Sequence, residues 1–183
     1  MPDTGLLCYC RAGFEPELAA ELSDRAARRG LDGYPKAGRG EGFVQFLGEQ
    51  GHALAQALPL RELIFARQKL RLLAELRDLD PKDRIPSVIA ALFERQAYGA
   101  LVVEHPDTDA AKPHAGLARG FGNALRPALR RVGLLAAQED QTLPRLHVCL
   151  LDGDHLLLAS GHPPDAAPWP HGIPRQALHR DAP

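Results

Sequence analysis

Cysteine and histidine are the residue types in this sequence that could hold a metal ion. One residue separates Cys8 from Cys10, and one separates His147 from Cys149, so each pair would share one face of a strand. If the two strands were neighbours, the four side chains could form a tetrahedral site. Ligand pairs rarely have this spacing on strands, and free cysteine is commonly buried as a small apolar residue. The pattern therefore favours buried thiols over a metal centre.

Three alternating glycines, Gly38, Gly40 and Gly42, resemble the start of a phosphate-binding loop. Such a loop needs a helix directly after it, because the helix N-terminus contributes to anion binding. Here a strand-like run at residues 43–46 follows instead. We therefore predict a hairpin connection. Catalysis has no candidate centre either, because the sequence shows no nucleophile elbow, no HExxH and no arguable triad.

A basic segment at residues 112–132 is the most informative stretch. No acidic residue occurs between positions 110 and 138, and four basic residues fall within about 40° of each other on a helical wheel: Lys112, Arg119, Arg126 and Arg130. An apolar stripe lies roughly 165° away by the same arithmetic: Leu117, Phe121, Leu125, Ala128 and Val132. The basic line suits a phosphate backbone, but it equally suits a solvated face paired with acids elsewhere. Pro127 is expected to kink the helix.

A second basic concentration contains Arg61, Arg67, Lys69 and Arg71. The last three alternate, so on a strand they would share one face. The residues alone favour a solvated strand face here.

Composition limits the class of protein. The chain has 183 residues and a net charge of −1, so global charge gives no reason to expect nucleic acid, and a polyanion would need a local patch. Three cysteines cannot supply a disulfide framework. The N-terminus lacks the basic region of a signal peptide, and no apolar run approaches the length of a membrane span. A cytoplasmic location without a membrane is the expectation.

Turn and periodicity signals divide the chain into alternating elements. In the first part we predict strands at 5–10, 31–36 and 43–47, helices at 15–29 and 52–58, and an apolar run from 63 that continues to 76. In the second part we predict helices at 87–96 and 112–132, a strand at 100–104, and a hairpin of strands 146–151 and 155–159. Both parts have an α+β order. The proline-rich residues 161–183 resemble a linker.

Several stretches spread along the chain resemble the ribosomal RNA large subunit methyltransferase M family. The most specific are Leu-Ile-Phe-Ala-Arg-Gln at residues 63–68 and Gly-Ile-Pro-Arg at residues 172–175. The others lie at residues 7–15, 83–85, 103–108, 119–130, 132–135 and 181–183. Their order and spacing make coincidence improbable.

The resemblance implies an α+β fold with mixed sheets and packed helices: a ferredoxin-like subdomain at 1–66, then a THUMP domain, which is an RNA-binding module, at 67–160. It also implies that residues 161–183 lead to a methyltransferase domain that uses S-adenosylmethionine. This chain carries no glycine-rich cofactor loop and no catalytic residues for that chemistry, so no cofactor is expected in it. Whether the chain is part of an enzyme depends on its parent protein. The implied partners are 23S rRNA and that methyltransferase domain.

With the resemblance, the RNA-contact interpretation of the basic residues gains weight. The predicted contact residues are Lys112, Arg119, Arg126, Arg130, Arg67 and Lys69. Two alternatives stay open: a THUMP module of a tRNA-modifying enzyme, and a protein-interaction domain without an RNA role.

Overall fold

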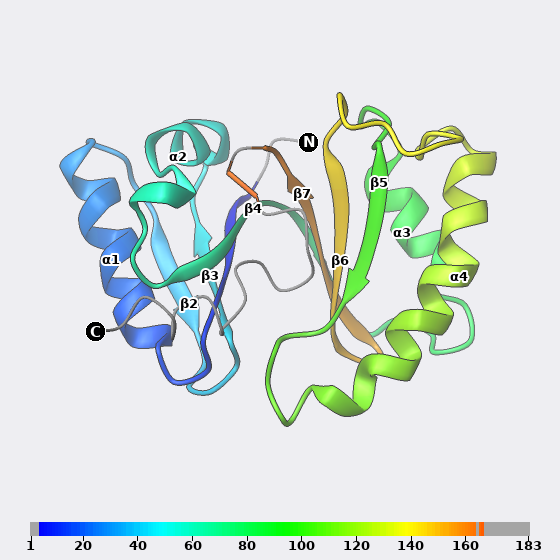
Figure 1. The fold of residues 1–183 in the computed structure, drawn as a ribbon, viewed down its shortest axis with the longest axis horizontal. Coiled ribbons are helices and arrows are strands. Elements are labelled where there is room, and N and C mark those ends of the chain that lie inside the picture. Colours follow the sequence, from blue (N-terminus) through cyan, green and yellow to red (C-terminus); the bar gives the residue numbers. More distant parts are fainter. Residues whose placement is uncertain (1–3, 164, 167–183) are drawn as a thin grey trace, which may run out of the picture.

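The computed structural model describes residues 4–163, 165 and 166, and its centre is a seven-stranded sheet (Figure 1). The strand order is β2-β3-β1-β4-β7-β6-β5. Only the β5–β6 pair is parallel among the paired strands. The strands are β1 Gly5–Cys10, β2 Tyr34–Ala37, β3 Phe43–Leu47, β4 Ala66–Leu76, β5 Ala100–Glu104, β6 Arg145–Asp152 and β7 His155–Gly161. The helices are α1 Glu15–Arg28, α2 Gly51–Ala57, α3 Ile85–Leu92 and α4 Ala115–Arg131, with short 3-10 turns η1 Leu60–Glu62 and η2 Lys112–His114.

The first half has the strand-helix-strand-strand-helix-strand order of a ferredoxin-like unit. Helices α1 and α2 cover one face of its four strands (Figure 1). Helix α1 forms because Pro16 suits a first turn, while Leu18 and Leu22 recur at helical spacing and are fully buried. They pack with Phe46 and other apolar side chains of β1 and β3.

The second half places α3 and α4 against strands β5, β6 and β7 (Figure 1). Its core contains Leu125 and Leu129 of α4, Val88 and Leu92 of α3, and apolar residues of the three strands. The ferredoxin-like start and the α+β architecture expected from the sequence are therefore confirmed.

Strand β4 joins the two halves into one sheet, because it pairs with β1 on one side and β7 on the other. Its register shifts between Leu72 and Ala74, as in a β-bulge. Leu73 packs in the core of the second half, whereas Leu70 and Leu72 face the opposite side of the sheet. The predicted boundary between residues 66 and 67 falls at the start of this shared strand and stays a prediction.

The opposite face of the sheet carries a third apolar cluster that links the halves. Leu7 and Phe43 of the first half pack there with Leu157 and Ala159 of the second. The described part of the chain is therefore held together by side-chain packing as well as by strand pairing.

Several predicted elements differ from the structure at their ends. The strand expected at 31–36 is Tyr34–Ala37, and the helix expected at 87–96 is Ile85–Leu92, because Pro86 is tolerated in a first turn. The expected linker lies mostly outside the described residues.

Candidate nucleic-acid interface

Helix α4 carries the basic segment and is anchored by a buried stripe. The buried residues are Ala118, Phe121, Gly122, Leu125 and Leu129. Gly122 lets the helix approach β5 closely, since a Cβ there would lie 3.3 Å from Val103 Cγ2. The helix ends at Arg131, and Gly133, two residues later, has φ +78°. Leu134 N–H donates to Leu129 O at 2.9 Å, and Gly133 N–H donates to Arg130 O at 3.1 Å, which is a Schellman ending.

Three arginines share one flank of α4. Arg119 and Arg130 are exposed and Arg126 is half-buried. At 100° and 1.5 Å per residue they stay within about 40° and spread along roughly 16 Å of helix. The described residues offer none of them an acidic partner within ion-pair distance. Three of the four cations in the line predicted from the sequence therefore share this flank.

The apolar stripe is not where the wheel placed it. Val132 is 51% exposed and lies just after the helix, while Leu117 and Ala128 are only half-buried. The stripe that is actually buried lies about 100° from the arginine face, by the same wheel arithmetic. The arginines therefore occupy a flank of the helix, not the side directly opposite the sheet.

Helix α4 runs without interruption from Ala115 to Arg131, with Pro127 inside it, and the kink expected at Pro127 stays a prediction. Proline removes one backbone donor, which leaves the carbonyl of Asn123 without its usual partner. Both Asn123 and Pro127 are exposed, so water can reach that carbonyl. The arginine line is not interrupted.

Lys112 lies outside this helix. It belongs to the 3-10 turn η2, so the α-helical wheel does not apply to it. Its Nζ lies 3.0 Å from Asp109 Oδ1, and both side chains are largely exposed. Exposed ion pairs are worth little, so this contact leaves the lysine available to another anion.

Arg67 and Lys69 are buried, so the solvated strand face expected for them is wrong. Arg67 Nη1 donates to Asp107 Oδ2 at 2.9 Å. Lys69 Nζ donates to Ala55 O and lies 3.4 Å from Asp165 Oδ2. Burial lowers the pKa of Lys69, although Asp165 opposes the shift. Helix α2 and the loop after β5 cover these two side chains, and the sequence could not reveal that packing.

The glycine loop forms the predicted hairpin between β2 and β3, and an internal carboxylate accepts hydrogen bonds from its backbone N–H groups. The carboxylate of Glu15, which is buried, accepts hydrogen bonds from Gly40 N–H at 2.7 Å, Gly42 N–H at 3.0 Å and Gly13 N–H at 3.1 Å. Burial by itself would raise the pKa of Glu15, but these bonds lower it below its ordinary value. The loop therefore serves the fold and binds no phosphate through these groups.

The cysteine and histidine pairs are not brought together. Strand β1 carries Cys8 and Cys10, and strands β4 and β7 separate it from β6, which carries His147 and Cys149. Cys8 and Cys149 also belong to cores on opposite faces of the sheet. Among the described residues no group of three or more ligand-type side chains could hold a metal ion.

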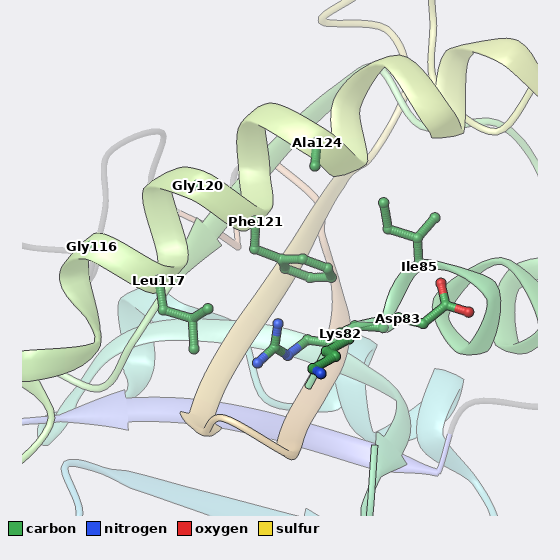
Figure 2. Close-up of a pocket in the computed structure, with 9 residues that line it drawn as sticks. Lys82, Asp83, Ile85, Gly116, Leu117, Gly120, Phe121 and Ala124 are labelled. Atoms are coloured by element: carbon green, nitrogen blue, oxygen red, sulfur yellow. The ribbon is translucent and has the colours of Figure 1, made fainter. Parts of the chain in front are cut away.

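Sequence reasoning missed a groove beside α4 (Figure 2). It has a volume of about 360 Å³ and lies between the helix and the loop that precedes α3. Gly116, Gly120 and Ala124 form its helical wall, and Lys82 and Arg84 come from the loop. Arg84 Nε donates to Gly153 O at 2.7 Å, and its guanidinium lies 6.0 Å from the centroid of Phe121. Asp80 and Asp83 stand beside these two cations in the sequence, so the segment shows no local excess of positive charge.

Solved structures of longer proteins share this fold. The described chain superimposes with a TM-score of 0.55 on a possible methylase from Clostridium difficile 630, at 13% identity, covering 90% of this chain and 42% of that one. It superimposes with a TM-score of 0.54 on TrmN from Thermus thermophilus, at 18% identity, covering 88% of this chain and 46% of that one. These likenesses establish the fold class.

Sequence comparison identifies the family within this class. Residues 3–70 match the RlmM ferredoxin-like domain, and residues 83–161 match the model described as ribosomal RNA large subunit methyltransferase M, N-terminal. Ribosomal RNA large subunit methyltransferase M of Xanthomonas campestris pv. campestris strain B100 is 61% identical over 98% of this chain. The chain belongs to this family, and it spans 52% of that relative's length. The family resemblance noted from the sequence is confirmed.

No helix among the described residues combines the length and apolar character needed to cross a bilayer.

Proposed function

We propose that this chain is the RNA-recognition part of a ribosomal RNA methyltransferase, and that it positions 23S rRNA for 2′-O-ribose methylation by a catalytic domain elsewhere in its parent protein. In this proposal the second half acts as a THUMP domain. S-adenosylmethionine is the methyl donor and belongs to the catalytic domain. The family membership supports an rRNA methyltransferase as the parent.

The observation that carries the RNA role is the arginine flank of α4. Arg119, Arg126 and Arg130 project along one continuous helix without an acidic neighbour among the described residues. Their spread of roughly 16 Å is long enough for successive phosphates of one strand rather than for a single anion. Each phosphate that an arginine neutralises releases condensed counterions, which drives binding.

The groove beside α4 adds Lys82 and Arg84 on the other flank of the helix, because its wall residues Gly120 and Ala124 lie roughly 100–140° from the three arginines by the same wheel arithmetic. Asp83 lines the groove as well (Figure 2). The two cations reach the groove from the loop before α3, and Gly116 and Gly120 form its helical wall together with Leu117, Phe121 and Ala124. A backbone can approach α4 closely at Gly116 and Gly120, since a Cβ at either position would meet no atom within 4 Å. Backbone contacts of this kind would position the RNA without reading its sequence.

Steady-state kinetics of the full-length parent protein test this function. Replacing Arg119, Arg126 and Arg130 together by glutamine should raise the KM for rRNA while kcat stays close to wild type, because the arginines bind RNA away from the reacting atoms. Replacing Arg28, Lys36 and Arg61 by glutamine removes the same charge from exposed positions outside α4 and should leave KM unchanged. Equal KM values for both triple variants would refute the RNA role of α4.

A further inference from the structure

An exposed apolar patch lies at the other end of the molecule from α4. Phe14, Ile64 and Phe65, with the nearby Arg11, surround a hollow of about 280 Å³ where β4 begins. We call this group the Phe14–Ile64 patch. Ile64 is 76% exposed and Phe14 is 38% exposed. Figure 1 places α1, which follows Phe14, and α4 at opposite ends of the long axis.

The patch is held in place by hydrogen bonds and ring packing. The Glu21 carboxylate of α1 accepts hydrogen bonds from Ile64 N–H at 2.8 Å and Phe65 N–H at 3.2 Å. The rings of Phe14 and Phe65 stack with centroids 6.0 Å apart, and the Arg11 guanidinium lies 5.9 Å from the Phe14 centroid. Isoleucine is therefore presented to solvent by a fixed loop.

Leu63 and Phe65 pack with the first core, but Ile64 belongs to no core cluster of the described fold. The side chains that close the first core, such as Leu18, Leu22 and Phe46, are already fully buried without Ile64. Single exposed apolar residues are normal, but a fixed group around a hollow is typical of an interaction site. Apolar contact with a protein surface, rather than a phosphate backbone, is the interaction such residues favour.

The position of the last described residues indicates which protein surface is nearby. Asp165 Oδ1 accepts a hydrogen bond from Leu60 N–H at 3.4 Å. Asp165 therefore lies beside Leu60, which precedes Ile64 by four residues in the sequence. The matched relative is about twice as long as this chain, and the matched region is described as N-terminal. The described chain therefore passes close to the segment that precedes the patch, and the remaining half of such a protein is the protein surface tethered to it.

From these observations we propose that the catalytic half of the parent protein docks on the Phe14–Ile64 patch and seats an apolar side chain in the hollow. This inference rests on the proposed function only in requiring that a second domain follows this one. RNA is a weaker occupant, because Arg11 is the one exposed cation lining the hollow and Arg67 at its floor is ion-paired with Asp107. Docking there would leave the arginine flank of α4 open to RNA.

Thiol labelling of single cysteine variants tests the docking. Ile64→Cys is compared with Phe93→Cys, which is 75% exposed on the other half of the molecule and so is a matched control. Each is labelled with a maleimide, in the 183-residue chain and in the full-length parent protein, and the rate at each position is followed by peptide mass spectrometry. The native thiols react slowly, because they are buried and burial raises the pKa of Cys8 and of Cys10 to about 12.

Both variants should react at similar rates in the 183-residue chain. In the full-length protein Ile64→Cys should react roughly tenfold or more slowly, because an undocked minor state is populated at only a few per cent, and Phe93→Cys should be unchanged. Equal rates for Ile64→Cys in the two proteins would overturn the proposal. So would protection that appears only with added RNA, or protection of the 183-residue chain that grows with its own concentration.

A second variant tests the docking without thiol chemistry. Ile64→Glu should leave the Tm of the 183-residue chain unchanged, because the side chain is exposed, and should lower the Tm of the full-length protein. An unchanged Tm in both would contradict docking. Neither expected result depends on RNA, so failure of the α4 arginines to bind RNA would leave both results unaffected.

Discussion

The Glu15 carboxylate accepts a hydrogen bond from Gly40 N–H at 2.7 Å, across 25 residues of sequence. This contact fixes the β2–β3 hairpin to the start of α1. The carboxylate occupies the backbone N–H groups that a phosphate would need, so the glycines that resemble a phosphate-binding loop stabilise the fold instead. The same carboxylate sits in the first turn of a helix, where the helix dipole also favours a negative charge.

We predict that Glu15→Gln destabilises the chain by about 2–4 kcal/mol, because hydrogen bonds to a charged group contribute roughly 1.5–3 kcal/mol each and the amide NH₂ would face backbone donors. Urea unfolding followed by circular dichroism measures the change. Glu17→Gln is the control, since Glu17 lies in the same helical turn but is exposed. A loss as large for Glu17→Gln would show that only the helix dipole is involved.

Glu15 should also make stability depend on acid pH. Its folded-state pKa lies below the ordinary value of 4.5, so the folded chain holds the ionised form more strongly than the unfolded chain does. Its contribution is complete above pH 4.5 and is lost as the pH falls through the lowered pKa. Unfolding free energies measured from pH 7 to pH 3 should fall more steeply for wild type than for Glu15→Gln. Parallel curves would contradict this role.

One glycine inside α4 and one just after it should respond in opposite directions to alanine. Gly120 lies inside α4, where a Cβ would meet no atom within 4 Å, so Gly120→Ala should stabilise by about 0.5–1 kcal/mol. Gly133 has equal space but φ +78°, so Gly133→Ala should destabilise by about 1 kcal/mol. Thermal unfolding of the two variants supplies the comparison, and shifts of the same sign would show that the helix ends elsewhere.

Arg67 should matter for stability and not for RNA. Arg67→Gln removes one partner of a largely buried ion pair with Asp107 and should cost about 2 kcal/mol, less than for a fully buried pair because Asp107 is partly exposed. Chemical unfolding measures this loss. The affinity of the folded full-length variant for rRNA should equal that of wild type, and a specific loss of affinity would return Arg67 to the interface.

The parts of the fold that the sequence predicts well are those with strong local signals. The strands at 5–10, 43–47 and 100–104 are short apolar runs bounded by turns, and their ends match the structure. The periodicity predicts a helix at 112–132, close to the observed α4 at Ala115–Arg131, but the predicted apolar stripe is rotated from the one that is buried. Apolar side chains such as Val132 were counted as core although that position lies beyond the last helical turn.

Features that depend on distant packing could not be predicted. Arg67 and Lys69 alternate as a solvated strand face would, yet α2 and Asp107 bury them. The sequence predicts Glu15 only as part of a helix, because its hydrogen-bonding partners lie 25 and 27 residues away. Lys82 and Arg84 became visible as neighbours of α4 only in three dimensions.

The salt dependence of rRNA binding tests the central claim most directly. At about −0.7 per phosphate neutralised on a single strand, loss of three contacts should reduce the slope of log K against log salt by roughly 2. The measurement is a titration of a 23S rRNA fragment with the full-length protein at several salt concentrations, for wild type, the Arg119/Arg126/Arg130→Gln variant and the Arg28/Lys36/Arg61→Gln control. The account predicts a shallower slope for the α4 variant alone. An unchanged slope in a variant that circular dichroism shows to be folded would mean that α4 presents a solvated face and that the RNA surface lies elsewhere.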